Sequence, residues 1–351
     1  MSERTSFKDL SPDELRERLE AQGHERFRAD QLLAWVYRRG VAEPEAMTDL
    51  SKALREELCA EWNFRPLSCE RVDVSKDGTR KFSLRTNDGA LIESVVIPEA
   101  RRNTLCVSTQ VGCALACSFC ATGAMGFDRN LQASEIVDQL CIAREVLGAD
   151  DPITNIVFMG MGEPLMNLPN VLRAIEIFIA PKAFAMAPRR ITVSTVGVIS
   201  RIGPLLEAAP VNLAVSLHAT TNAVRDELVP LNRSVPLESL LGTLRSEPRI
   251  TPRRPVFFEY TLMAGVNDSP EDAGRLPNLL RGIPCRINVI PMNPHPDAPQ
   301  RAPEKAVVDR FTQVLHEAGM IVTLRRSRGS DIAAACGQLA RRAPREATTQ
   351  S

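Results

Sequence analysis

The spacing of hydrophobic residues changes along the chain and divides it into three predicted parts. In residues 1–63 the apolar positions recur at helical spacing. Residues 11–14 read Ser-Pro-Asp-Glu, the pattern of a helix start with a capping box and a proline in the first turn. Further helices are expected over residues 28–39 and after Asp49. The pattern therefore predicts a small helical domain over residues 1–63.

Short alternating runs follow in residues 64–98, separated by the turn signals Asp77-Gly78 and Asn87-Asp88-Gly89. Such turns favour hairpins, so we expect a three-stranded β meander that links the flanking parts. Glu93 lies among apolar neighbours in the last run, ALIESVVIP. A carboxylate in such surroundings can have a raised pKa and act as a base, but many strand glutamates are gatekeepers or salt-bridge partners. Both interpretations stay open at this point.

Residues 99–341 alternate between β-branched strands and amphipathic helices. Strands are expected at residues 104–110, 153–159, 190–195, 211–217, 255–262 and 285–290. Helices are expected near residues 133–148, 167–180, 198–208, 236–246, 269–281 and 304–318. Six successive βα units predict an α/β fold with a parallel sheet closed, or nearly closed, into a barrel; a doubly wound open sheet is the alternative. Residues 342–351 are expected to form a disordered tail.

Composition limits the class of protein. The 351 residues include 43 basic and 43 acidic side chains, which argues against nucleic-acid binding through bulk positive charge alone. Apolar residues at 44% and charged residues at 25% are typical of a globular protein. No apolar run approaches the roughly 18 residues of a membrane span, and the first residues lack the apolar core of a signal peptide. We therefore expect a cytoplasmic protein.

Polar residues gather where the predicted strands end, which is where the active sites of barrel folds lie. Each of these residues alone has an ordinary structural interpretation, such as a turn former or a hydrogen-bonded core residue. Together they predict a single ligand pocket. They are Cys113, Cys117 and Cys120 after the first strand, Gly162 and Glu163 in MGMGEP after the second, Ser194 on the third, Ser216 and His218 on the fourth, and Asn293 after the sixth.

Three of the nine cysteines, Cys113, Cys117 and Cys120, lie within eight positions. An odd cysteine count without an export signal argues against a disulfide framework. Three thiolates with an open coordination position are typical of a [4Fe-4S] cluster that binds a substrate or cofactor. The alternative is a zinc site completed by distant Cys106, Cys336 or His218.

The stretch CVSTQVGCALACSFCATGAMGFDRNL resembles the signature of radical S-adenosylmethionine (radical SAM) enzymes, in particular the RNA adenine-C2 methyltransferases that act on 23S rRNA and tRNA. The blocks FRADQLLAWVYRRGV, MGMGEPLMN, ITVSTVGV, LAVSLHA, INVIPMNP and RRSRGSDIAAACGQL are similar to family blocks in the same order. The resemblance implies a partial (β/α)6 barrel, a [4Fe-4S] cluster, SAM and a flavodoxin or ferredoxin-type reductant. Related adenine-C8 methyltransferases share most blocks, so the C2 or C8 regiochemistry stays open.

The resemblance also implies individual roles. The cluster ligands are the three grouped cysteines, and Cys336 receives a methyl group from one SAM before a radical made from a second SAM activates it. Cys106 then resolves the RNA–protein link through a transient disulfide with Cys336, and Glu93 accepts the proton of the base carbon. The implied SAM contacts are Gly162, Glu163, Ser194, Ser216, Leu217, His218 and Asn293.

Arginine supplies 37 of the 43 basic residues and suits contacts with phosphate and bases. Local clusters occur at Arg101-Arg102, at Arg189-Arg190, within residues 249–254 and at residues 325–328, the last close in sequence to Cys336. A monomer is expected. A zinc-stabilised RNA-binding factor without turnover is the alternative from another class of protein.

Overall fold

The computed structural model describes residues 4–296 and 298–339, and its amino-terminal part is helical as predicted. Helix α1 begins after Ser11, whose hydroxyl accepts a hydrogen bond from the Glu14 amide while the Glu14 carboxylate accepts one from the Ser11 amide. This reciprocal pair is the expected capping box. The elements of this part are β1 (Thr5–Ser6), η1 (Phe7–Asp9), α1 (Pro12–Ala21), α2 (Phe27–Leu33), a π-helical turn η2 (Ala34–Arg38), η3 (Pro44–Ala46), α3 (Lys52–Glu61) and β2 (Trp62–Asn63).

The meander and the barrel strands form one ten-stranded sheet in the order β14-β13-β12-β11-β10-β9-β6-β5-β4-β3. The meander strands are antiparallel, and β5 also pairs antiparallel with β6. Within this sheet, every pairing from β6 to β14 is parallel. The strands are β3 (Leu67–Val74), β4 (Arg80–Thr86), β5 (Leu91–Glu99), β6 (Arg102–Cys106), β9 (Ile153–Phe158), β10 (Ile191–Thr195), β11 (Asn212–Ser216), β12 (Val256–Leu262), β13 (Cys285–Pro291) and β14 (Val322–Leu324).

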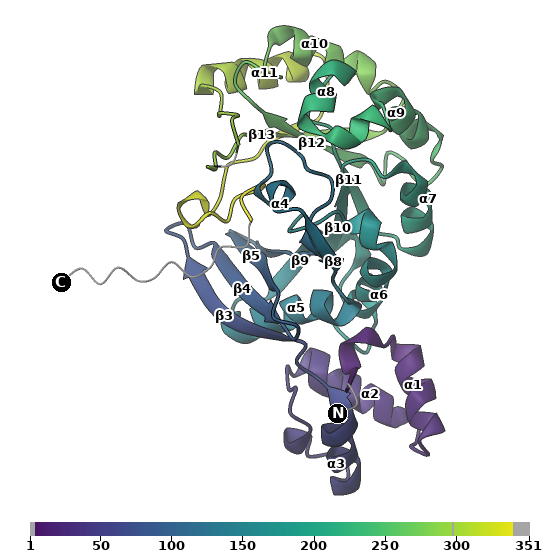
Figure 1. The fold of residues 1–351 in the computed structure, drawn as a ribbon. Coiled ribbons are helices and arrows are strands. Elements are labelled where there is room, and N and C mark those ends of the chain that lie inside the picture. Colours follow the sequence, from purple (N-terminus) through teal and green to yellow (C-terminus); the bar gives the residue numbers. More distant parts are fainter. Residues whose placement is uncertain (1–3, 297, 340–351) are drawn as a thin grey trace, which may run out of the picture.

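Each parallel strand is added on the same side of the one before it, so the strand order never reverses. A doubly wound sheet requires such a reversal, and that alternative is therefore wrong. Right-handed crossovers in one direction place the connecting helices on one face, and Figure 1 shows them along the outside of the curved sheet. The sheet ends at β14 and β3, which makes the barrel partial. The connecting helices are α5 (Ala133–Leu147), α6 (Leu168–Ile179), α7 (Ile199–Ala208), α8 (Asn222–Leu228), α9 (Leu237–Ser246), α10 (Pro270–Leu279) and α11 (Lys305–Glu317).

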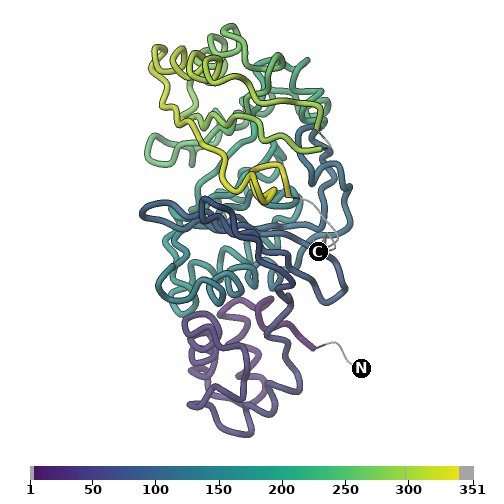
Figure 2. The backbone as a smooth tube through the Cα atoms, turned by 90° about the vertical axis from the view of Figure 1, so that its left-hand side faces the viewer, coloured from purple at the N-terminus to yellow at the C-terminus, as the bar shows by residue number. Residues whose placement is uncertain are grey.

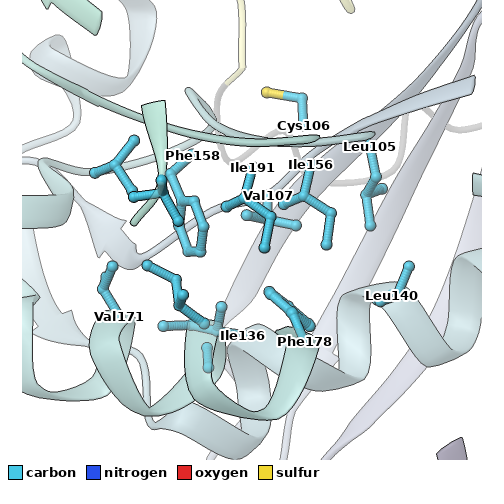
Figure 3. Close-up of a cluster of buried hydrophobic side chains, with 14 of the residues drawn as sticks. Leu105, Cys106, Val107, Ile136, Leu140, Ile156, Phe158, Val171, Phe178 and Ile191 are labelled. Carbon is cyan, nitrogen blue, oxygen red and sulfur yellow. The ribbon is translucent and has the colours of Figure 1, made fainter. Parts of the chain in front are cut away.

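The two faces of β6 have different surroundings. Leu105 is fully buried with Ile136 and Phe178 in the layer between the sheet and its helices. The Cys106 sulfur points to the opposite face of the sheet, away from these apolar side chains (Figure 3). Because side chains alternate along a strand, the packing of Leu105 against the helices directs Cys106 to the inner face.

The helical part docks against α5 and α6 through polar contacts that surround an apolar core. The buried Lys8 ammonium pairs with Asp138 of α5, and Asp138 also accepts a hydrogen bond from the Leu67 amide at 3.1 Å. Arg173 of α6 pairs with Glu14 of α1 at 2.6 Å. These contacts attach the small helical part to the outer face, away from the inner face that Cys106 points to.

The chain returns to the inner face after β14, where η7 (Ser330–Ile332) precedes Cys336. Figure 2 shows this yellow segment between the blue meander and the green half of the barrel. The predicted tail over residues 342–351 lies outside the described residues. Among the helices of the described chain, none combines the length and the apolar character needed to cross a membrane.

Candidate active site

The three grouped cysteines lie in a loop held by a small hairpin, which consists of β7 (Gln110–Gly112) and β8 (Phe127–Asn130). The Cys113 amide donates to the Gly126 carbonyl at 2.8 Å and closes the loop at its base. Gly112 has φ +77°, and a Cβ atom there would lie 1.9 Å from the Gly126 oxygen. Glycine is therefore required where the loop begins.

The loop brings three thiols close together in partly buried positions. Burial raises the pKa of Cys113 to about 11, and Cys120 and Glu163 add to this effect. Burial also raises the pKa of Cys117, and the neighbouring Cys120 and Cys113 contribute. A bound cation would reverse these shifts, because thiolates are the ligand form.

The chemistry of these donors bears on the two predicted metal sites. Within residues 4–296 and 298–339, no three His, Cys, Asp or Glu side chains converge on one point as a single metal ion requires. In a [4Fe-4S] cluster each thiolate binds a different iron, so its ligands surround a cube and need not meet at one ion. The three thiols of this loop supply the donor type that such a cluster requires, and their role as its ligands stays a prediction.

The MGMGEP segment after β9 is packed against the start of the cysteine hairpin. A Cβ atom at Gly162, where φ is +96°, would lie 2.5 Å from the Gln110 Cβ, and one at Gly160 would lie 2.7 Å from the Val107 carbonyl oxygen. Close approach of the protein's own chain thus requires both glycines. The Glu163 carboxylate accepts backbone N–H bonds from Leu165 and Val196, each at 3.0 Å. Burial nevertheless raises its pKa to about 7.

The strand ends meet beside this loop as predicted. Ser194 lies on β10, Ser216 ends β11, and His218 follows with φ +57° and a buried ring. Burial, assisted by Arg225, lowers the pKa of His218 to about 3. Its Nδ1 accepts the Thr261 amide at 3.0 Å, so the neutral ring carries its proton on Nε2. The ring of Phe119, from the cysteine loop, stacks edge-on against it at 4.7 Å between centroids.

Arg225 is an organising residue that the sequence analysis missed. It lies on α8, is 1% exposed, and donates to the carbonyls of Val196 at 2.6 Å, Ser216 at 3.1 Å and Leu217 at 3.0 Å. It thereby ties the ends of β10 and β11 together beneath His218. An arginine in a short helix reads as a solvated residue, and only its burial identifies its role.

The segment around Cys336 packs directly on the cysteine loop. The Ala121 amide, next to Cys120, donates to the Gly337 carbonyl at 2.8 Å. The Thr122 hydroxyl donates to the Leu339 carbonyl at 2.7 Å in a buried position. Two residues more than 200 positions apart in sequence are thus joined at the predicted cluster.

Asn293 holds the same segment from the other side. Its amide nitrogen donates to the Cys336 carbonyl at 3.1 Å, and its oxygen accepts the Ser327 hydroxyl. The family resemblance implies that Asn293 and Glu163 contact SAM. The described structure shows both side chains engaged by the protein itself, and their contact with SAM stays a prediction.

Cys106, Glu93 and Lys81 share the inner face of the sheet. Val95 of β5 is paired with Cys106 of β6 on one side and with Lys81 of β4 on the other. Glu93 is two residues from Val95 along β5 and therefore points to the same face. Lys81 Nζ lies 3.0 Å from Glu93 Oε1, so the predicted salt-bridge partner of Glu93 is Lys81.

Cys336 completes this group of residues. Cys106 and Cys336 are both free thiols. Burial raises the pKa of Cys106 to about 12 and the nearby Cys336 adds to it, while burial and Glu259 raise the pKa of Cys336 to about 11. Cys336 is a solvent-exposed residue, whereas Cys106 is buried. The structure thus brings the two distant thiols into one site.

The arginine clusters differ in position. Arg189-Arg190 and residues 249–254 precede β10 and β12, so they lie at the end of the barrel opposite the site. Arg102 pairs with Glu99 at 2.5 Å. Arg325 and Arg326 are exposed, and the charge of Arg325 acts on the Cys336 thiol.

Two protein families match this chain. Residues 5–63 match the family described as the ribosomal RNA large subunit methyltransferase N-terminal domain, and residues 107–276 match the radical SAM superfamily. The first match spans the helical part, and the second runs from the end of β6 to α10.

Curated relatives and a solved structure extend the similarity over nearly the whole chain. A Desulfotalea psychrophila protein named dual-specificity RNA methyltransferase RlmN is 47% identical, covering 96% of this chain and 95% of the relative. The Geobacter sulfurreducens protein of the same name is 48% identical, covering 95% and 91%. The crystal structure of a radical SAM methyltransferase from Sphaerobacter thermophilus is 46% identical with a TM-score of 0.92, covering 95% of this chain and 99% of that one.

Proposed function

Because this chain belongs to the RlmN family of radical SAM RNA methyltransferases, we propose that it methylates C2 of adenosine in 23S rRNA and in tRNA. The names of its relatives support two RNA substrates, and the first matched family supports ribosomal RNA as one of them. We propose that it acts as a cytoplasmic monomer with a flavodoxin or ferredoxin-type reductant.

The proposed roles follow from what the reaction demands. Adenine C2 is an electron-poor carbon that does not attack a sulfonium methyl group, so a radical route is required. The [4Fe-4S] cluster and SAM, when bound, supply the one-electron chemistry, and Cys113, Cys117 and Cys120 would hold the cluster. Cys336 carries the methyl group to the base, Glu93 accepts the C2 proton, and Cys106 releases the product by forming a disulfide with Cys336.

One observation carries this proposal: the segment of Cys336 is hydrogen-bonded to the cysteine loop. The bond from Ala121 to Gly337 joins the predicted methyl carrier to the predicted cluster loop. The charge of Cys336 contributes to the raised pKa of Cys106, which supports the pairing of the resolving thiol with the methyl carrier. A methyl carrier must meet both partners in one catalytic cycle.

RNA is proposed to approach from the side of Arg325 and Arg326. Both are exposed and follow β14 at the same end as Cys336. Guanidinium groups contact phosphates in bidentate fashion, and the target base must leave its stack to reach an enclosed site. Folded RNA loops meet this demand more readily than a continuous duplex.

The test uses the full chain reconstituted without oxygen. The proposal expects a brown protein that consumes two SAM per methylated adenosine, and a colourless, zinc-containing protein would contradict it. Cys336→Ala should abolish methylation with the fold intact. Cys69→Ala removes an exposed cysteine on β3 as the matched control and should keep the activity.

The position of methylation is tested separately. Mass spectrometry of nucleosides from the RNA of a deletion strain should show loss of 2-methyladenosine. Loss of 8-methyladenosine would instead assign C8 chemistry to the same scaffold.

A further inference from the structure

Lys81 is a buried cation at the proposed active site that no step described so far uses. It lies on β4 and is 4% exposed, while its partner Glu93 on β5 is 6% exposed. Their charged atoms are 3.0 Å apart. A buried ammonium requires an anionic partner, and a buried carboxylate stays ionised only where a cation or hydrogen-bond donors stabilise its charge.

The Lys81 ammonium also contacts the segment that carries Cys336. Its Nζ lies 3.5 Å from the carbonyl oxygen of Ala333, three residues before Cys336. Ala333 has φ +52°, a conformation that is uncommon for alanine and that directs the turn into Cys336.

The turn between β3 and β4 binds the same segment. The Ser75 hydroxyl donates to Asp331 at 2.6 Å, and the Gly329 amide donates to Asp77 at 3.1 Å. The strand that bears Lys81 therefore holds the Cys336 segment at several points. Glu93 and the methyl carrier are thus linked through one side chain.

We propose that Lys81 is a positioning residue for proton removal from the target base. It offsets the charge of the Glu93 carboxylate and orients this group toward the inner face, beside the Cys336 segment. This inference rests on the proposed role of Glu93 as the proton acceptor.

The step balances within this pair. Glu93 takes the C2 proton and becomes a carboxylic acid, while the electrons of the C–H bond stay in the RNA–protein adduct. Lys81 keeps its three protons, so the net charge of the pair rises from zero to one. No oxidant or reductant is needed for this transfer.

The inference separates two half-reactions. Methyl transfer to Cys336 does not involve Glu93, so removing Lys81 should leave that transfer intact. Proton removal from the base should become slow, and the covalent RNA–protein adduct should accumulate. A substrate carrying deuterium at C2 should then react more slowly than the protium form.

The experiment compares Lys81→Met, Lys81→Arg and Lys8→Met in the reconstituted full-length enzyme. Lys81→Met should lower product formation about 100-fold, the size of effect typical of proton-transfer catalysis, and should keep Cys336 methylation within about twofold. Lys81→Arg should recover about a tenth or more of the wild-type rate, because it restores the charge with altered geometry. Lys8→Met removes the other buried lysine of an ion pair and should not accumulate adduct.

The outcomes distinguish this inference from the proposed function. Wild-type product formation by Lys81→Met would overturn the role of Lys81 alone, provided that Glu93→Gln is inactive. An active Glu93→Gln would overturn the role of Glu93 and the inference with it. Equal loss of Cys336 methylation and of product in Lys81→Met would indicate a purely structural residue. If Lys81→Met does not fold, the deuterium effect of Lys81→Arg decides, and an effect equal to that of the wild type overturns the inference.

Discussion

Two buried lysine–carboxylate pairs share their chemistry and differ in what surrounds them. Lys8 and Asp138 join the helical part to α5, with Phe7 and Trp62 among the buried residues nearby. Lys81 pairs with Glu93 on the inner face of the sheet, beside the segment of Cys336.

The surroundings determine what each pair can do. Asp138 uses its second oxygen to accept the Leu67 amide, which satisfies the carboxylate inside a structural interface. Burial would lower the pKa of Lys8, but Cys141 and Asp138 raise it. The pair at the interface thus docks two parts of the molecule. The pair on the inner face lies where a substrate base is proposed to enter, beside the segment of Cys336.

The largest effect is expected when the ion pair at the interface is broken. Asp138→Asn leaves the Lys8 charge buried without an anion, which should lower the free energy of unfolding by about 3–5 kcal/mol. Urea denaturation measures this loss. Activity per folded molecule should stay near that of the wild type, and a specific loss of activity would contradict the division of roles.

A smaller effect concerns His218, a buried residue of the site. Its pKa of about 3 lies below the ordinary value of 6.5, so the unfolded chain binds more protons between these pH values. The contribution of His218 to the free energy of unfolding is therefore present above pH 6.5 and is lost as the pH falls. The loss reaches about 2 kcal/mol at pH 5. The free energy of unfolding of His218→Gln, taken from unfolding curves at pH 7 and pH 5, should not show this decrease. His316→Gln, at an exposed position, is the control and should keep it.

The next effect tests the attachment of the Cys336 segment to the strand of Lys81. Gly329 has φ +64°, and a Cβ atom there would lie 2.8 Å from Thr79 Cγ2. Gly319 has a similar φ of +75°, but a Cβ atom there would meet nothing within 4 Å. Gly329→Ala should therefore lower the free energy of unfolding by about 1 kcal/mol more than Gly319→Ala does. Only Gly329→Ala should slow the methylation of Cys336. If the two variants behave equally in denaturation and methylation assays, the contact between Gly329 and Thr79 does not position the Cys336 segment.

The smallest effect is expected for a double variant that keeps the interface but removes both of its charges. Lys8→Met combined with Asp138→Asn should have a stability within about 1.5 kcal/mol of the wild type, because a neutral amide still accepts the Leu67 amide. Thermal unfolding of the single and double variants measures the coupling. A double variant as unstable as Asp138→Asn would show that packing by the Lys8 stem, and not its charge, is what matters.

Much of the fold follows from local sequence patterns. The capping box at Ser11 and the turn at Asp77-Gly78 act over a few residues, and the structure has both as predicted. The barrel strands and helices lie close to their predicted positions because apolar periodicity is a local property. The second helix departs from the expectation, since α2 passes into a π-helical turn from Ala34 to Arg38. The comparisons confirm the radical SAM resemblance.

The site was predictable only in part. Cys113, Cys117 and Cys120 have a spacing that stands out in one loop. Arg225 and Lys81 have no such signal, because a lone basic residue in a short helix or strand is usually solvated. Gly162 was expected to contact SAM, and the structure shows that the chain's own approach to residues 107–110 requires glycine at positions 160 and 162.

The sequence by itself determined which elements form and which loop holds the three thiols, because caps, turns and apolar periodicity depend on neighbouring residues. The tertiary structure alone decided that Lys81, Glu93 and Cys106 share one sheet face, since this depends on strand register across β4, β5 and β6. It also decided that Cys336 returns to that face, through contacts such as that between Ser75 and Asp331, 256 residues apart. Long-range pairing depends on the packing of the whole chain, so no local pattern encodes it.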